Sequence, residues 1–439
     1  MILSRIRPLL LNLFYSLKAS FWLIPILMLA GALLTAPAIV RLDVWLAANT
    51  ASPLWQGFKL SPDGAREILS VIAGSMITVA SLVFSMTLVA LSLVSQQLGP
   101  RIPQIFMEDR PTQVMLGLFI ATFLFALAVL GSLGIASGGD RDFVPRISVL
   151  IAAILAVFSF VAIILFIHHI ARSIQADIVV FNTAQKLQSA IGSMAHDCGE
   201  TAMWLNREEF EALSAAVERN ACDVKLSRRS GYVQYVDEEG ALALAKEHDV
   251  RIALRCRPGH FVLRGRPLLL ASPADRIEDE LREKLESLIH LGELRTREQR
   301  VEFEMLALVE IALRAISPGI NDPFTAISCI DRLSEALANL MERDNGYRVL
   351  TDKDGDQRVL CYPQTFEHYL DSTFDPIRHA AADIPMVLDR IEHTLKELQA
   401  IAAKEMQARA LGDQLGLLEK QKNRPRLNNP IPTETVITD

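Results

Sequence analysis

Four long runs of apolar residues lie in the N-terminal part of the chain, and none of them contains Asp, Glu, Lys or Arg. The runs cover residues 21–40, 68–94, 114–136 and 147–167. A helix needs about 20 mainly apolar residues to cross roughly 30 Å of hydrocarbon, so each run predicts a transmembrane helix. We therefore expect residues 1–170 to form a four-helix membrane domain whose two ends emerge on the same side.

The second run differs from the others because hydroxyl side chains recur along one side of the helix that it predicts. At about 100° per residue they fall within about a third of the circumference, and the opposite face is Ile, Val, Leu and Met. Small polar residues of this kind let helices approach closely, and they also line hydrated pores. The candidates for either role are Ser75, Thr78, Ser81, Ser85 and Ser92.

After the fourth run the pattern becomes that of a water-soluble domain. Apolar residues at helical spacing predict a helical connector over residues 171–220, and alternating residues between turns predict a small α/β module over 221–271. A helical region is expected over 272–420, with a β-hairpin near 348–360 and a last amphipathic helix from about Pro385 to Lys420. A polar tail over 421–439 is expected to be disordered. The predicted fold class is a membrane α-helical domain of four transmembrane helices plus a mixed α/β domain that is mostly helical.

One junction between predicted helices in this region carries a cluster of polar residues. Ser317-Pro318-Gly319 ends one helix, and Asp322-Pro323 begins the next with Asp322 as its cap. Backbone N–H groups at such a helix start can also receive an anion, although capping alone explains the aspartate. The candidates for binding a partner or an anionic ligand are Ser317, Gly319, Asn321, Asp322 and Thr325.

Three arginines in the α/β module form a second candidate surface. Arg251, Arg255 and Arg257 alternate with apolar residues on one predicted strand. The module carries a net charge of +3, whereas residues 169–439 as a whole carry −10. A solvated strand face explains the alternation, and contact with anionic headgroups or an anionic ligand is the alternative. The overall negative charge excludes non-specific binding to nucleic acid, which needs a basic surface.

Cysteines and flanking charges predict the topology. The five cysteines all lie in the C-terminal part, lack CxxC spacing and suggest free thiols in a reducing compartment: Cys198, Cys222, Cys256, Cys329 and Cys361. Arg5, Arg7 and Lys18 precede the first span and favour a cytoplasmic N-terminus. We expect the N-terminus and the C-terminal domain to be cytoplasmic. Cleavage of a signal peptide at Ala36-Pro37-Ala38 is the alternative for the first run, which is longer than the roughly 7–15 residues of a signal core.

The sequence offers no pattern for catalysis, a cofactor or a metal. Gly-rich nucleotide loops, HExxH, GxSxG and paired-cysteine motifs are all absent from it. The segment Asp352–Asp356 resembles a calcium loop, but its glycine is misplaced and no closing Glu follows. Several His and Asp residues over 368–383 share a helical spacing, but Asp375-Pro376 is expected to start a new helix and to break their alignment.

Charges near the spans bear on transport. The absence of ionisable residues from the four runs argues against an active transporter, which usually couples to an ion gradient through buried charge. His168, His169 and Arg172 follow the fourth run. Anchoring at the bilayer interface explains them, and a pH-sensitive gate is the alternative.

Three segments identify a family resemblance: AGSMITVASLVFSMTLVALSLVSQQLGPR, FIHHIARSIQ and EIALRAISPGINDPFTAISCIDRL. Together they resemble the bacterial membrane-protein family called domain of unknown function 2254, over about residues 5–410. The resemblance implies an inner-membrane protein with a cytoplasmic C-terminal region, and it implies no catalytic residues. The Ser/Thr-rich second span and the segment Ser317–Thr325 are hallmarks of that family.

Two functions fit these patterns best, and a membrane-embedded enzyme is a third alternative that no catalytic motif supports. The first is an oligomeric, channel-like conduit in the bacterial inner membrane, with the second span lining the path. The second is a membrane-anchored scaffold or sensor whose cytoplasmic domain binds a protein partner or a small anionic ligand. In both cases the expected partners are the lipid bilayer and further copies of the chain.

Overall fold

The computed structural model describes residues 22–49, 60–99, 109–135, 144–194, 202–226, 229–293, 300–343, 347–362 and 365–423. The chain divides into two compact units, one up to Val179 and the other from Val180 onward. Each has its own hydrophobic core.

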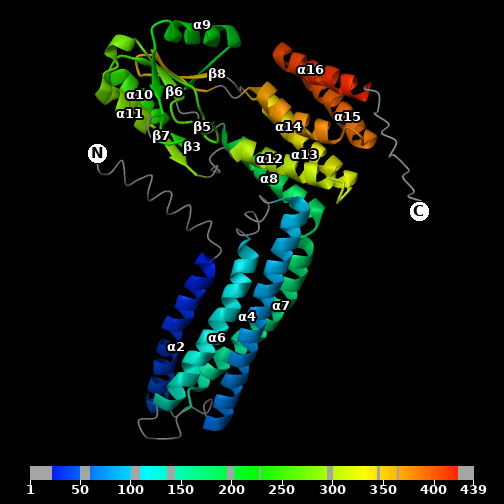
Figure 1. Ribbon diagram of the computed structural model, residues 1–439. Helices are drawn as coiled ribbons and strands as arrows, with labels where there is room; N and C mark the ends of the chain where they lie inside the picture. The colour runs from blue at the N-terminus through cyan, green and yellow to red at the C-terminus, as the bar shows by residue number, and fades with distance from the viewer. Residues whose placement is uncertain are drawn as a thin grey trace, which may run out of the picture. The chain divides into compact units, whose positions relative to one another are not determined.

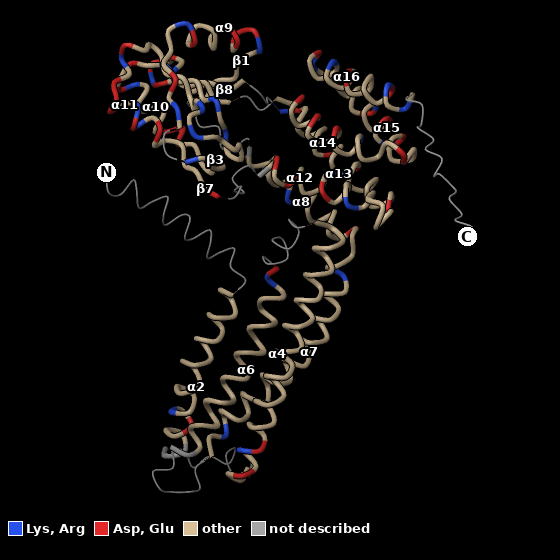
Figure 2. Tube along the Cα trace, in the orientation of Figure 1, with Lys and Arg blue, Asp and Glu red and all other residues tan. Residues whose placement is uncertain are grey.

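The N-terminal unit is a bundle of four helices: α2 (Leu23–Asn49), α4 (Pro62–Leu98), α6 (Arg110–Ile135) and α7 (Arg146–Ser173). Each is long and apolar enough to cross a bilayer, which confirms the four predicted spans (Figure 1). The described Lys, Arg, Asp and Glu residues of the bundle lie toward the helix ends (Figure 2). The apolar centre of the bundle therefore matches the hydrocarbon layer.

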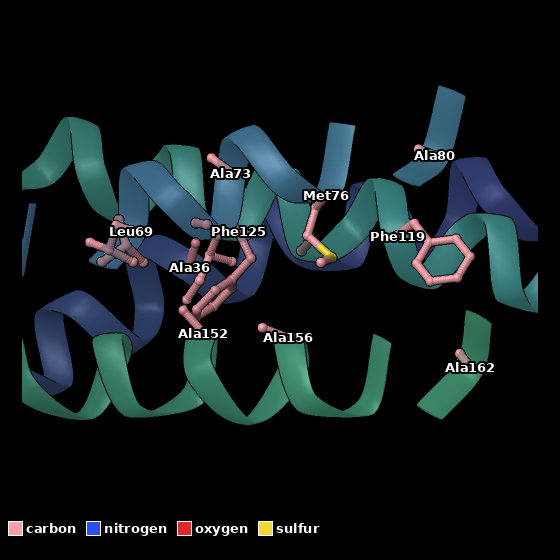
Figure 3. Packing of buried hydrophobic residues seen from close by; sticks show 14 of the residues in the cluster. Ala36, Leu69, Ala73, Met76, Ala80, Phe119, Phe125, Ala152, Ala156 and Ala162 are labelled. Atoms are coloured by element: carbon pink, nitrogen blue, oxygen red, sulfur yellow. The ribbon is translucent and has the colours of Figure 1, made fainter. Parts of the chain in front are cut away.

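Helices α6 and α7 hold the bundle together, because α2 and α4 each pack against both of them. Phe119 and Phe125 of α6 are completely or almost completely buried in the shared core. Around them lie alanines such as Ala36 of α2 and Ala152 of α7 (Figure 3). Small residues let neighbouring helices approach closely, and the aromatic rings fill the remaining space.

Helix α4 is longer than a bilayer requires. Ser61 caps it by accepting a hydrogen bond from the Gly64 N–H at 3.1 Å, and Pro62 occupies the first turn. With 37 residues at about 1.5 Å each, the helix is roughly 55 Å long. It therefore extends beyond a hydrocarbon core of about 30 Å.

The C-terminal unit contains a six-stranded sheet in the order β1-β8-β9-β4-β6-β2. Its strands are β1 (Ala202–Leu205), β2 (Cys222–Lys225), β4 (Arg251–Leu254), β6 (Pro267–Ser272), β8 (Tyr347–Thr351) and β9 (Gln357–Leu360). The pair β4–β9 is parallel and the other pairs are antiparallel. A second, antiparallel sheet has the order β5-β3-β7, built from β5 (Phe261–Val262), β3 (Gly231–Val236) and β7 (Ile289–Gly292).

Both faces of the larger sheet are covered. Ala253 and Leu270 pack on one face with Phe210 of α9 (Arg207–Glu218). Ile252 and Leu269 belong to the core on the other face. That second core also includes residues of α10 (Glu238–Glu247) and α11 (Asp279–Ser287), and the short helix η1 (Ala274–Arg276) precedes α11.

The remaining helices pack on one another: α8 (Ala176–Met194), α12 (Arg300–Ala315), α13 (Pro323–Met341), α14 (Phe366–Ala380), α15 (Pro385–Ile401) and α16 (Glu405–Lys422). Helix α13 contacts α12, α14 and α15, and α16 packs on α14 and α15. Asn339 of α13 donates a hydrogen bond to Gln188 of α8 at 2.6 Å. The mixed, mostly helical fold class is thereby confirmed.

Several elements differ from the expected boundaries. Strand β1 interrupts the expected connector over 171–220, and the hairpin β8–β9 belongs to the same sheet as the α/β module. Strand β7 lies in a segment expected to be helical, and α15 and α16 replace the single last helix. Residues 424–439 of the predicted tail lie outside the described residues.

The expected helix start at Asp375-Pro376 is wrong. Helix α14 continues through Pro376, because Tyr369, Phe374 and Ile377 bury one continuous face of it. That burial offsets the single backbone hydrogen bond that a proline removes. Within the described ranges, no group of His, Cys, Asp and Glu is placed to hold a metal ion.

Candidate functional site

Most hydroxyl residues of α4 lie on the side that no described helix of the chain covers. Thr78, Ser81, Ser85 and Ser92 are exposed, and Ser75 is half-buried. Ser85 follows the buried Met76 by nine residues, which is about two and a half turns and hence the opposite side of the helix. The stripe therefore does not serve the packing of α4 on α6 and α7.

Three of the five hydroxyl groups on this face donate hydrogen bonds within α4 itself. Ser75 donates to the Ile72 carbonyl at 3.0 Å, Thr78 to that of Gly74 at 2.9 Å and Ser81 to that of Ile77 at 2.9 Å. Such bonds lower the cost of placing a hydroxyl in a membrane helix. The oxygen atoms retain lone pairs that water, an ion or a facing helix can use.

Gly74 extends the stripe, although it has no hydroxyl group and therefore was not among the predicted candidates. From Gly74 the residues at alternating steps of four and three are Thr78, Ser81, Ser85, Leu88, Ser92 and Ser95. This is the seven-residue repeat along which two helices pack in a left-handed crossing. An added Cβ at Gly74 would meet nothing within 4 Å in the same chain. We call this set, from Gly74 to Ser95, the α4 seam.

Among the described residues of the bundle, the buried polar side chains lie on α2, α6 and α7, and no periodic pattern in the sequence marks them. Thr122 of α6 and Ser159 of α7 are both buried, and their hydroxyl oxygens lie 3.2 Å apart. At one end of α7, Asp43 of α2 accepts hydrogen bonds from Ser148. Both pairs join helices of one chain, so the packing of these helices explains why the polar groups are buried.

His168 and His169, which follow the fourth span, lie in different environments. His168 is exposed, whereas Nε2 of His169 lies 2.8 Å from Oδ2 of Asp109. The same carboxylate oxygen accepts a hydrogen bond from the Thr112 N–H at 3.1 Å at the start of α6. His169 and Asp109 thus join the ends of α6 and α7, a contact that interfacial anchoring alone does not predict.

The polar junction in the C-terminal unit is a tight turn between α12 and α13. The Asp322 carboxylate accepts from the N–H of Thr325 at 3.2 Å and from its hydroxyl at 2.6 Å, which confirms the predicted cap. Asn321 adopts a positive φ of 52°, and its N–H donates to the Ser317 carbonyl at 2.9 Å. Gly319 and Asn321 are exposed, Ser317 is half-buried and Thr325 is buried.

The expected arginine face is not a single surface. Strand β4 ends at Leu254, so the alternation stops before Arg255, and both faces of the strand are covered. Arg251 is exposed, and Arg255 forms an ion pair with Glu218 of α9. Arg257 is buried and cannot contact a headgroup, which corrects its assignment as a surface residue.

Arg257 instead joins the sheets to the helices of this unit. Its Nη2 lies 3.0 Å from the Glu302 carboxylate of α12, and the same atom lies 2.6 Å from Nε2 of His368 on α14. Its Nε donates to Nε2 of His260 at 3.0 Å. Burial raises the pKa of the neighbouring Tyr369 hydroxyl above its usual value, so that group stays neutral.

The described cysteines form no disulfide with one another, as the scattered spacing predicts; Cys198 lies outside the described residues. Burial raises the pKa of the Cys256 thiol to about 12, and burial is also the main cause that raises that of Cys361 to about 12. Such thiols are protonated at neutral pH and do not act as nucleophiles.

Four apolar spans joined to a separate folded unit define an α-helical integral membrane protein. The chain belongs to the family described as predicted membrane protein DUF2254, whose model matches residues 18–397. It is 28% identical over 395 residues to uncharacterized proteins of Mycobacterium bovis and Mycobacterium tuberculosis, covering 88% of this chain and 72% of each relative. No solved structure matches the chain.

Proposed function

We propose that the protein is a subunit of an oligomeric, channel-like conduit in the bacterial inner membrane, with the α4 seam facing the path. The N-terminus and the C-terminal unit lie in the cytoplasm in this proposal, and that unit assembles or gates the conduit. No catalytic step is part of it.

One observation carries the proposal: within the part of the chain that the structure describes, the hydroxyl stripe of α4 faces away from the other helices of the bundle. Hydrocarbon cannot use the remaining lone pairs of Thr78, Ser81 and Ser85, whereas water, ions or another helix can. The small residues of the seam permit the close approach of further copies of α4. A ring of such helices would present hydroxyl groups without fixed charge to a central path.

Assembly is tested with two glycines that share the same environment within one chain. Gly74 lies on the α4 seam and Gly131 on α6; both are exposed, and an added Cβ meets nothing within 4 Å at either. Gly74→Leu is expected to reduce the oligomer measured by light scattering in detergent, whereas Gly131→Leu leaves it intact. A wild-type protein that is strictly monomeric, or an equal effect of both substitutions, contradicts the seam.

Conduction is tested by ion flux from liposomes that contain the purified protein, with and without membrane tension. We expect wild-type flux that Ser85→Leu lowers severalfold and that Gly131→Leu leaves unchanged. Absence of flux under both conditions, from protein shown to be folded and oriented, would contradict a conduit. Unaltered flux in Ser85→Leu would show that α4 does not line the path.

A scaffold or sensor is the second candidate, supported by two apolar side chains beside the turn between α12 and α13. Phe324 is 70% exposed and Ile320 40% exposed, next to the polar Asn321. A photo-crosslinking residue in place of Phe324 is expected to capture one partner in cells, and Asn321→Ala to abolish the product. The same probe in place of Met386, which is 39% exposed on α15, serves as the control. Equal products at both positions would refute a specific site.

A further inference from the structure

The outer face of the small sheet β5-β3-β7 exposes apolar and aromatic side chains. Phe261 and Leu263 are 54% and 55% exposed, while Val262 between them is buried in the core. This is the alternation of a strand with one covered face. Tyr232 supports Phe261 edge-on at 5.0 Å between ring centroids, and Tyr235, 43% exposed, extends the face along β3.

Two arginines follow these residues in the segment that crosses from β5 to β6. Arg264 and Arg266 are exposed and flank Gly265, whose positive φ of 84° forms the turn. Among the described residues, no ion pair joins either guanidinium to an acid. They therefore differ from Arg255 and Arg257, which are paired with Glu218 and Glu302.

The local sequence concentrates positive charge. Residues 255–267 contain four arginines and no Asp or Glu, although residues 169–439 carry a net charge of −10. A groove of about 910 Å³ runs beside the segment, with Phe261, Leu263 and Arg266 in its lining. The acids that line it are Glu218, which is engaged by Arg255, and the exposed Asp223.

We propose that this face, which we call the β5 face (Tyr232, Tyr235, Phe261, Leu263, Arg264 and Arg266), binds the surface of an anionic lipid bilayer. Aromatic and apolar side chains enter the boundary between headgroups and acyl chains, and guanidinium groups bind lipid phosphates. Charge complementarity selects this occupant: each unpaired arginine near an anionic surface strengthens binding by about fivefold. The proposal does not depend on conduction.

The test uses the whole protein in nanodiscs, labelled with a fluorophore at Leu263→Cys. Cys198→Ser and Cys222→Ser remove the other candidates for labelling, since the remaining cysteines are buried. Quenching by a nitroxide on the lipid acyl chain reports contact with the bilayer. Met406→Cys on α16 is the matched control, because Met406 is 55% exposed, as Leu263 is.

We expect quenching at position 263 but not at 406 when the nanodiscs contain phosphatidylglycerol. Replacing the lipid by phosphatidylcholine alone, or introducing Arg264→Gln with Arg266→Gln, is expected to lower the quenching several-fold. Absence of quenching, or equal quenching in neutral lipid, overturns the proposal. Immobilisation of the label at 263 already in detergent would indicate that the β5 face binds a second protein chain. That result would also overturn the proposal.

Discussion

Asp43 of α2 caps the start of α7 from more than 100 residues away in the chain. Its carboxylate accepts a hydrogen bond from the Ile147 N–H at 3.0 Å, from the Ser148 N–H at 2.9 Å and from the Ser148 hydroxyl at 2.6 Å. Asp43 and Ser148 are both buried. One side chain thus satisfies free donors of α7 and fixes that helix to α2.

Asp43→Ala should destabilise the bundle because it leaves buried donors at the start of α7 without an acceptor. The expected loss is about 1–3 kcal/mol, measured by unfolding of the detergent-solubilised protein. Asp63→Ala is the control, since the Asp63 side chain is 97% exposed. Equal stability of the Asp43 variant and wild type would contradict the capping role.

Gly117→Ala should destabilise the packing of α2 against α6. An added Cβ at Gly117 would lie 2.6 Å from Sδ of Met28 and 3.2 Å from the backbone of Pro25. Overpacking of this kind costs about 1–3 kcal/mol, whereas Gly131→Ala adds a methyl group in open space. Thermal unfolding of both variants measures the difference, and an equal melting temperature for the two would refute the close approach.

Arg257→Met should be much more damaging than Arg255→Met, although both remove an ion pair of the same unit. Loss of Arg257 removes one ion-pair partner of the Glu302 carboxylate, which is 17% exposed and keeps His368 at 3.6 Å, and costs up to about 3–5 kcal/mol. The pair of Arg255 and Glu218 is largely exposed and is worth less than about 1 kcal/mol. Denaturant unfolding of the two variants checks this order, and similar losses would contradict it.

Glu392 should stabilise the contact between α15 and α16 only above acidic pH. Hydrogen bonds from Lys396 and Lys422 lower the pKa of Glu392 from 4.5 to about 2. A lowered folded pKa adds stability that is present above the unfolded value and is lost as the pH falls through the folded value. The melting temperature of Glu392→Gln should therefore lie below that of wild type at pH 7, and the gap should close between about pH 4.5 and 2. A gap independent of pH would argue against this pair.

The sequence predicts the four spans because hydrocarbon imposes a length and a composition on each helix. It also predicts the Asp322 cap and the hairpin β8–β9, since both depend on neighbouring residues. Strand β1 was not predicted, because its partner in the sheet is β8, about 145 residues further along. Long-range pairing of this kind leaves little trace in local periodicity.

For the candidate residues too, the sequence predicts local features but not the contacts between distant parts of the chain. A helical projection places the hydroxyl groups of α4 on one side, but only the packing of α6 and α7 determines that this side lies away from the helices described. The alternation around Arg257 resembles a solvated strand, yet that side chain is buried and contacts Glu302 of α12 and His368 of α14, which the sequence does not place beside it. The surface arginines Arg264 and Arg266 carry no periodic signal at all.

A path lined by α4 is tested most directly by block of flux with a charged, membrane-impermeant thiol reagent in proteoliposomes that carry Ser85→Cys. Such a path predicts that the reagent stops the flux in this variant and leaves flux unchanged in Gly131→Cys, an exposed position on α6. Flux that persists in Ser85→Cys after the reagent is added, or that stops equally in both variants, would contradict a path lined by α4.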